Sequence, residues 1–427
     1  MIHRSLLLAA ALGITGITAM AQEKVLINQV EEKVPPYTLP DPLQFSDGSS
    51  VSSPNDWARR RRELLRLFEA HVYGTIPAGL TRRSPRPVSI RSDALNGLAI
   101  RKILQVPLTD DPSPVLMELM VYLPKNATSA VPIFLGLNFS GNHTVTLETD
   151  VPLSGGWLPK SATGATNHIA TEASRGTDSA AWPIEQILAR GYGFATAHYS
   201  DIEPDFDGGW RKGVRGRALS GHTRSGFAPE DWGAISAWSW GLSRAFDALA
   251  EDPLIDSKRV ALLGHSRLGK TALWAGARDP RFALIVANES GEGGAALARR
   301  EFGETILRIT TSFPHWFCGR FKNYSRATET LPIDQHELIA LIAPRPVYIA
   351  SAQEDLWADP KGEYLAGWHA TPVYQLLGLQ GLPSASMPAL NSSVGDAVGY
   401  HIRSGKHALT SADWGHYLNF ADRHLKH

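Results

Sequence analysis

The residues whose types suggest chemistry are a serine, two carboxylates and a histidine in the second half of the chain. They are Ser266, Glu289, Asp355 and His407, in that order. A serine hydroxyl is a poor nucleophile until a base removes its proton, and imidazole accepts protons near neutral pH. A carboxylate would hold the imidazole tautomer and stabilise the imidazolium. These residues therefore suit covalent catalysis by an activated serine.

The segment Arg259–Ala277 indicates how the serine would be presented. It begins with an apolar run, continues through Gly264, a polar turn and Gly269, and becomes helix-forming from about Leu268. We predict a strand, a tight turn and a helix. A serine at the apex of such a turn projects its hydroxyl above the C-terminal edge of a parallel sheet, where backbone N–H groups point outward. Ser266 is thus the predicted nucleophile.

The same segment also matches the phosphate-binding loop of nucleotide hydrolases. Gly264, Gly269, Lys270 and Thr271 complete the pattern G-x-x-x-x-G-K-[ST], whereas Leu268 stands where the serine pattern G-x-S-x-G has its second glycine. A nucleotide hydrolase prefers this loop near the start of its sheet, and here several predicted strands come first. The order of the chain therefore favours the serine hydrolase.

The choice of base depends on position, because the chain has 15 histidines. His407 lies in a loop after the last predicted strand, where an α/β hydrolase carries its catalytic histidine. His401 lies inside that strand, and His416, His424 and His427 fall on the predicted terminal helix. We predict that His407 is the base.

The acid that orients His407 has two candidates. Asp355 follows the apolar run Pro346–Ala352, and Glu289 follows the earlier run Phe282–Asn288 within a glycine-rich turn. Both end strands at the predicted catalytic edge. Either carboxylate fits the role, and the spacing leaves the choice open.

Two cations follow the nucleophile. Arg267 occupies the position whose backbone N–H helps to bind an oxyanion, and its guanidinium would add a charged donor. Lys270 comes one helical turn after Ser266. Cations beside a nucleophile favour an acidic or strongly polar substrate, unless they are paired with local acids such as Asp279.

The N-terminus has the features of a secretory signal. A basic start is followed by the apolar run Leu6–Ile17 and the small-residue triplet Ala19–Ala21. We predict a signal peptide over 1–21, a single catalytic domain over 22–427, and a periplasmic or secreted protein that is free of the membrane after cleavage. Export away from cytoplasmic ATP further disfavours the nucleotide hydrolase.

The composition excludes several classes. Lys+Arg and Asp+Glu both number 42, so no net charge attracts nucleic acid. Cys318 is the single cysteine, which excludes an intramolecular disulfide and a cysteine-based zinc site. We expect a monomer that needs no metal, nucleotide or other cofactor.

Apolar strands alternate with helical patterns along the chain. Such an alternation predicts an α/β fold in three layers, with a mostly parallel central sheet covered on both faces. Two long loops, Gly155–Thr177 and Asp201–Ala228, are predicted lids or binding walls. The loop after Val131–Asn138 is expected to contribute to an oxyanion hole. The other predicted strands are Val115–Leu123, Gly193–His198 and Val398–Arg403. The predicted helices are Trp57–Val72, Trp182–Arg190, a helix whose apolar stripe runs from Trp232 to Leu249, and a terminal helix from about Ser411.

Several motifs together resemble the glucuronoyl esterases of carbohydrate esterase family 15, which have the α/β-hydrolase fold. They are Gly264-His265-Ser266-Arg267-Leu268-Gly269-Lys270, Glu289-Ser290-Gly291, Phe313-Pro314-His315-Trp316-Phe317 and the His407 loop. They extend in order over most of the chain after residue 21. The first motif also accounts for the displaced second glycine.

The resemblance implies a role for each matching residue. Ser266 falls on the family nucleophile, His407 on its base, Glu289 on the acid of many members and Asp355 on an acid position of bacterial members. Arg267 falls on the oxyanion arginine. The positions that hold the uronic acid sugar correspond to Lys270, Glu304 and Trp357. Fungal members have a disulfide-forming cysteine where His265 stands, so the chain resembles the bacterial branch.

The implied activity is hydrolysis of esters of glucuronic or 4-O-methylglucuronic acid, such as those that join glucuronoxylan to lignin alcohols. The expected partner is a polysaccharide or oligosaccharide that carries such an ester. Three alternatives stay open: an acetyl-xylan or other carbohydrate esterase on the same fold, a carbohydrate-binding protein without activity, and the nucleotide hydrolase.

Overall fold

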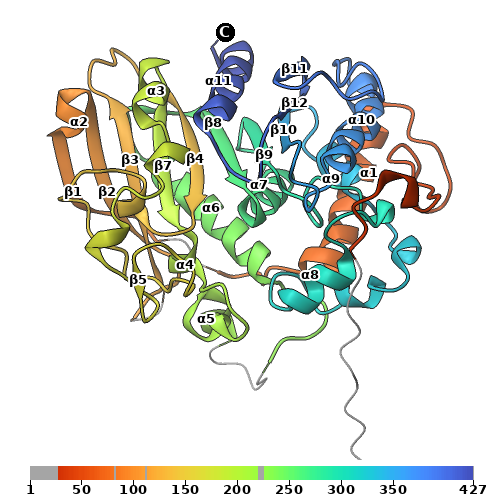
Figure 1. The fold of residues 1–427 in the computed structure, drawn as a ribbon, viewed down its shortest axis with the longest axis horizontal. Helices are drawn as coiled ribbons and strands as arrows, with labels where there is room; N and C mark the ends of the chain where they lie inside the picture. Colours follow the sequence, from red (N-terminus) through yellow and green to blue (C-terminus); the bar gives the residue numbers. More distant parts are fainter. Residues whose placement is uncertain (1–26, 81–82, 111–112, 220–225, 427) are drawn as a thin grey trace, which may run out of the picture.

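A ten-stranded sheet organises the protein in a computed structural model that describes residues 27–80, 83–110, 113–219 and 226–426. The strand order is β1-β2-β3-β7-β4-β8-β9-β10-β12-β11 (Figure 1). The predicted signal peptide lies outside the described residues. The strands are β1 Arg86–Asp93, β2 Ala99–Pro107, β3 Leu116–Pro124, β4 Val131–Asn138, β7 Gly193–His198, β8 Ile255–His265, β9 Leu284–Asn288, β10 Val347–Ala352, β11 Ser392–Gly395 and β12 Val398–Arg403.

The middle of the sheet is parallel and its two ends are antiparallel. Strands β7, β4, β8, β9, β10 and β12 pair in parallel, while β1, β2 and β3 at one end and β11 at the other pair antiparallel. The predicted α/β fold with a mostly parallel sheet is confirmed. The edge strand β1 and its neighbour β2 were not among the predicted elements. Every residue of β1 is exposed, so it lacks the apolar run that marks the buried strands.

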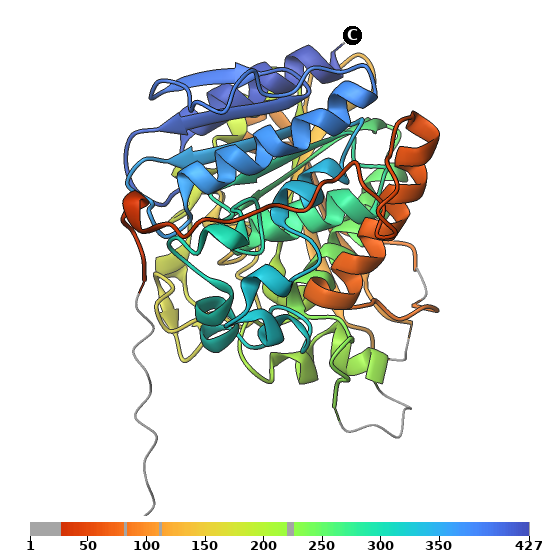
Figure 2. The same ribbon diagram turned by 90° about the vertical axis from the view of Figure 1, so that its right-hand side faces the viewer.

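Helices cover both faces of this sheet. Along β4, Ile133 and Leu135 pack into one core, whereas the intervening Phe134 packs into the other, because successive strand residues point to opposite faces. The first core is covered by α1, α6, α7, α9 and α10, and Figure 2 places α1 and α10 at the front. The second is covered by α3 and α11. The helices are α1 Pro54–Phe68, α3 Ile184–Ala189, α6 Ala234–Ala250, α7 Arg267–Arg278, α9 Gln335–Ala340, α10 Pro360–Leu376 and α11 Ser411–Leu425.

The strand register aligns the carboxyl ends that carry the predicted site. His265 of β8 pairs with Asn288 of β9, and Ala352 of β10 pairs with Arg403 of β12. Four neighbouring parallel strands therefore end at one edge. The residues that follow these ends include Ser266, Glu289, Asp355 and His407, so the fold brings the four predicted residues to one place.

The two long loops contain short elements rather than regular layers. The first contains the hairpin β5 Ala165–Thr166 and β6 Ile169–Ala170, and the second contains α5 Val214–Leu219. Between residues 27 and 426, no helix that the structure describes has the length and apolar character to cross a membrane. Cys318 is buried in the first core with a fractional exposure of 4%.

Candidate active site

Ser266 occupies a strained turn between β8 and α7. Its φ of 56° and ψ of −129° lie outside the regions that non-glycine residues favour, at an expected cost of about 1–3 kcal/mol. The turn depends on two glycines. A Cβ atom on Gly264 would lie 1.9 Å from the Leu268 carbonyl oxygen, and one on Gly269 would lie 2.9 Å from Cβ of Ser290. Close packing of strand, turn and helix therefore explains why the second glycine stands at position 269. Leu268, at the position where the G-x-S-x-G pattern has this glycine, is buried.

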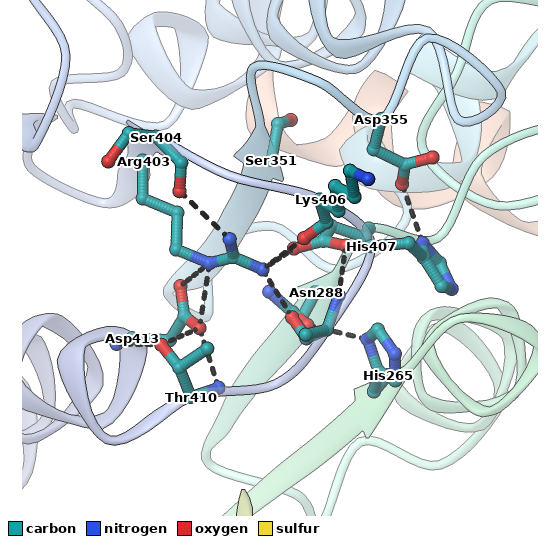
Figure 3. A network of polar contacts seen from close by, with 12 residues as sticks. His265, Asn288, Ser351, Asp355, Arg403, Ser404, Lys406, His407, Thr410 and Asp413 are labelled. Carbon is teal, nitrogen blue, oxygen red and sulfur yellow. Dashed lines mark hydrogen bonds and ion pairs between the residues drawn. The ribbon is translucent and has the colours of Figure 1, made fainter.

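His407 is held through its Nδ1 atom by both predicted acids. Nδ1 lies 2.6 Å from Oδ2 of Asp355 and 3.1 Å from Oε2 of Glu289 (Figure 3 draws the first contact). Because Nδ1 is the bonded nitrogen, Nε2 is the atom that would accept a proton. Burial lowers the pKa of the imidazole, but the hydrogen bonds to Asp355 and Glu289 outweigh burial and raise the pKa to about 9.

The two acids have different surroundings. Asp355 makes the shorter contact with His407. Glu289, with a left-handed φ of 46°, is fully buried and accepts hydrogen bonds from Nη2 of Arg403 at 2.6 Å and from the Ala408 backbone N–H at 2.9 Å. Burial raises its pKa against the opposing effects of His407 and Arg403. Glu289 thus fixes the loop that carries His407, while Asp355 contacts the imidazole more directly.

Arg403 is a functional residue that the sequence analysis missed. Its guanidinium bonds both carboxylate oxygens of Asp413 at 3.1 Å and donates to the carbonyl oxygens of Lys406 and Ala408, as well as to Glu289 (Figure 3). One buried cation therefore ties the end of β12, the His407 loop and the start of α11 together. Asp413 also forms a capping box with Thr410 at the start of α11.

His265 packs beside the predicted base. Its ring centre lies 4.5 Å from that of His407, and its Nδ1 lies 2.6 Å from Oδ1 of Asn288. Burial, with the charge of His407, lowers its pKa to about 3, so its ring stays neutral. His265 directly precedes Ser266, and this contact places the His407 ring beside the serine turn.

Three side chains of this cluster could hold a metal ion by their spacing. Nitrogen and oxygen atoms of His265, Glu289 and His407 lie within 4.8 Å of one another. The same three side chains take part in the hydrogen bonds described above. The absence of a metal from the reaction stays a prediction.

Arg267 lies in an aromatic enclosure. Its Nη1 donates to Oδ2 of Asp205 at 2.5 Å, and its guanidinium carbon lies 5.4 Å from the Phe139 ring centre and 5.0 Å from that of Trp316. Asp205, rather than Asp279, is its acidic partner. Phe139 belongs to the loop after β4 that was expected to help form the oxyanion hole. The Gly141 N–H of that loop donates to Oδ1 of Asn138. The Phe139 ring forms an aromatic wall beside Arg267.

The residues implied to hold the sugar lie together. Lys270 is 3% exposed, and its Nζ donates to the Ser290 carbonyl oxygen at 2.6 Å and lies 3.4 Å from Oε2 of Glu304. The Glu304 backbone N–H donates to the carbonyl oxygen of Trp357, whose indole is half-buried. The structure therefore brings Lys270, Glu304 and Trp357 to the turn that follows Glu289.

The phosphate-loop interpretation fits this geometry poorly. In such a loop the lysine would reach a phosphate and the Thr hydroxyl would bind Mg²⁺. Here Lys270 is bonded to Ser290, and Oγ1 of Thr271 donates to the Arg267 carbonyl oxygen at 2.9 Å. The Thr271 hydroxyl that would bind Mg²⁺ is therefore bonded within α7.

Comparisons with known proteins point to the same family as the sequence resemblance. A family model described as glucuronyl esterase of fungi matches residues 227–378. A carbohydrate esterase, MZ0003, from an unknown prokaryotic organism is 48% identical over 402 residues, covering 93% of this chain and 92% of its own. The 4-O-methyl-glucuronoyl methylesterase 1 of Wolfiporia cocos is 28% identical over 359 residues, covering 80% and 72%. The solved structure of a glucuronoyl esterase from Solibacter usitatus superposes with a TM-score of 0.88 at 45% identity, covering 93% of this chain and 100% of that one.

Proposed function

The chain belongs to the glucuronoyl esterases of carbohydrate esterase family 15, and we propose on this premise that it hydrolyses esters of glucuronic or 4-O-methylglucuronic acid. The curated relative from Wolfiporia cocos is a 4-O-methyl-glucuronoyl methylesterase, which supports this substrate class. A buried cation near the nucleophile supports it further. Lys270 follows Ser266 by one helical turn and is held by Ser290 and Glu304. It would bind an oxygen of the uronate ring, which a simple acetate ester lacks.

The reaction proposed for this site is acyl transfer through Ser266. His407 accepts the Ser266 proton at Nε2 while Oγ attacks the uronoyl carbonyl carbon. Asp355 and Glu289 stabilise the imidazolium that forms. The alcohol leaves with the proton from His407, and a water molecule then attacks the acyl-enzyme with His407 as base. The carboxylate product and free Ser266 result.

Arg267 is assigned to the oxyanion in this mechanism. Its guanidinium carries a fixed positive charge in a largely buried setting, where a hydrogen bond to a developing negative charge is strong. The N-terminus of α7, which starts at Arg267, adds the positive end of the helix dipole.

The enzyme is proposed to act outside the cytoplasm as a monomer. The predicted signal peptide over 1–21 supports export. The natural substrate would then be a lignin–glucuronoxylan ester or a fragment of one, because these polymers are extracellular. No part of the proposed reaction requires nucleic acid or a membrane.

Hydrolysis of benzyl glucuronate, compared with that of an acetylated xylose, tests the proposed function. We expect the wild-type protein to cleave the glucuronate ester with the larger kcat/KM, and Ser266→Ala to lose this activity while keeping its melting temperature. Preference for the acetylated sugar would instead support the acetyl-xylan esterase. A folded wild type that cleaves neither ester would support a binding protein, and undiminished activity of Ser266→Ala would refute the serine mechanism.

A further inference from the structure

Asp205 is surrounded by four hydrogen-bond donors from three parts of the chain. Its Oδ1 accepts from Nε2 of His315 and Nε1 of Trp316, both at 2.7 Å. Its Oδ2 accepts from Nη1 of Arg267 at 2.5 Å and from the Tyr199 hydroxyl at 3.1 Å. Two bonds to each oxygen leave this carboxylate little freedom to turn.

The carboxylate is buried yet charged. Its side chain is 3% exposed. Burial alone would raise its pKa, but the hydrogen bond from His315 and the positive charge of Arg267 outweigh burial and lower the pKa to about 2. Asp205 is therefore an anion at any pH at which the enzyme is expected to work.

Arg267 depends on this anion for its position. Asp205 is the acid that pairs with its guanidinium among the described residues, and the guanidinium also contacts the Tyr199 hydroxyl and the rings of Phe139, Phe313 and Trp316. Aromatic rings attract a guanidinium but define its rotation weakly, whereas a hydrogen bond to a fixed carboxylate sets its direction. The side chain keeps an exposure of 28%, so part of it stays open to a ligand.

The motif Phe313–Phe317 supplies both donors to Oδ1. Phe313 stacks on Trp316 with ring centres 3.8 Å apart, and His315 lies between them in the chain. This motif was noted in the sequence only as part of a family resemblance. Its geometry gives it a specific purpose: His315 and Trp316 hold one oxygen of Asp205, and the other oxygen then faces Arg267.

We infer that Asp205 is a positioning residue that fixes the Arg267 guanidinium beside Ser266 through hydrogen bonds from His315, Trp316 and Tyr199. This inference rests on the proposed function only in assigning Arg267 to the oxyanion. A misplaced donor weakens the transition state more than the bound substrate, since the oxyanion forms during the reaction. Loss of Asp205 should therefore lower kcat and leave KM nearly unchanged.

The test is Asp205→Asn, which keeps the side-chain size and removes the charge. We expect kcat to fall about tenfold to a hundredfold on benzyl glucuronate, with KM within about twofold, because an oxyanion donor is worth about a hundredfold or more. The fall on p-nitrophenyl acetate should be similar, because both esters form an oxyanion. In an Arg267→Ala background, the same Asp205→Asn change should lower kcat by less than about threefold. The exposed neighbour Asp207→Asn is the matched control and should behave as wild type.

The double-mutant comparison separates positioning from folding. The inference would be overturned if Asp205→Asn lowered kcat by the same factor in the wild type and in Arg267→Ala. A rise in KM with unchanged kcat would also overturn it. If Asp205→Asn does not fold, His315→Leu removes one hydrogen-bond donor and keeps the carboxylate. It should lower kcat by a smaller factor that vanishes in the Arg267→Ala background, and a persistent loss there would contradict the inference. A wild type that cleaves only p-nitrophenyl acetate would refute the proposed substrate, yet the Asp205 comparison could still be made on that ester.

Discussion

Arg403 and Glu289 are joined by a hydrogen bond of 2.6 Å between Nη2 and Oε1, although they lie 114 residues apart in the chain. Both side chains are buried, and the same guanidinium bonds the buried carboxylate of Asp413. One cation therefore neutralises two acids at the base of the His407 loop. Removal of that cation would leave two buried carboxylates without the arginine that they share.

We expect Arg403→Leu to lower the free energy of unfolding by about 3–5 kcal/mol, the usual effect of removing one partner of a buried ion pair. Urea unfolding would measure the loss. Arg320→Leu is a matched control, because its 3.6 Å ion pair with Glu230 is solvent-exposed and should contribute little. Equal stability of the Arg403 variant and the wild type would show that the network does not support the loop.

The raised pKa of His407 predicts a specific dependence of stability on pH. Its folded-state pKa of about 9 exceeds the ordinary value of 6.5, so the folded protein binds the proton more tightly than the unfolded chain. This contribution to stability is complete below pH 6.5 and is lost as the pH rises towards 9. The melting temperature of the wild type should therefore fall relative to that of His407→Gln over this interval. A constant difference between the two proteins would contradict the raised pKa.

The two acids should differ in their effects on catalysis. Asp355→Asn removes the closer anion from Nδ1, so the pKa of His407 should fall and the rising limb of kcat/KM should move to lower pH. Glu289→Gln should lower both the activity and the free energy of unfolding, because Glu289 also accepts hydrogen bonds from Arg403 and Ala408.

The double variant of Asp355 and Glu289 tests whether they share one task. If they do, its loss of kcat should exceed either single loss and approach that of His407→Ala. Unchanged kcat and pH profile in Asp355→Asn would exclude Asp355 from the catalytic set.

Lys270→Met should separate uronate esters from simple esters. For this variant we predict a loss of kcat/KM on benzyl glucuronate of about tenfold to a hundredfold, the effect of one or two charge-assisted hydrogen bonds. Hydrolysis of p-nitrophenyl acetate should change only a few-fold, because acetate presents no ring to the lysine. The exposed Lys258→Met serves as control. Equal losses on both esters would mean that Lys270 supports the turn at Ser290 rather than the substrate.

Local sequence patterns predicted the parallel part of the central sheet and the order of the site residues. The apolar runs located the buried parallel strands, and the order of Ser266, Glu289, Asp355 and His407 follows from strands that end at one edge. The exposed strand β1 carried no such signal. Its residues are exposed and pair with β2 on an open edge, where Arg86 also donates a side-chain hydrogen bond to Gln105.

The supporting polar contacts could not be predicted, because they join distant segments. Asp205 lies 62 residues before Arg267, in a loop whose charges look like ordinary surface charges. A sequence shows that Arg403 ends an apolar strand, but not which acid will meet it. Likewise, the spacing left the choice between Asp355 and Glu289 open, and only their distances to Nδ1 distinguish them.

The burial of Cys318 makes the protein suitable for site-specific labelling. It is the sole cysteine of the chain, and only 4% of its surface is accessible, so a thiol reagent should modify the folded enzyme slowly. A second cysteine placed on an exposed residue, such as Asp207, could then be coupled to a fluorophore without a cysteine-free background. The loop that carries Asp205 could be followed spectroscopically during turnover, and the protein could be produced in a reducing cytosol, since its folding requires no disulfide.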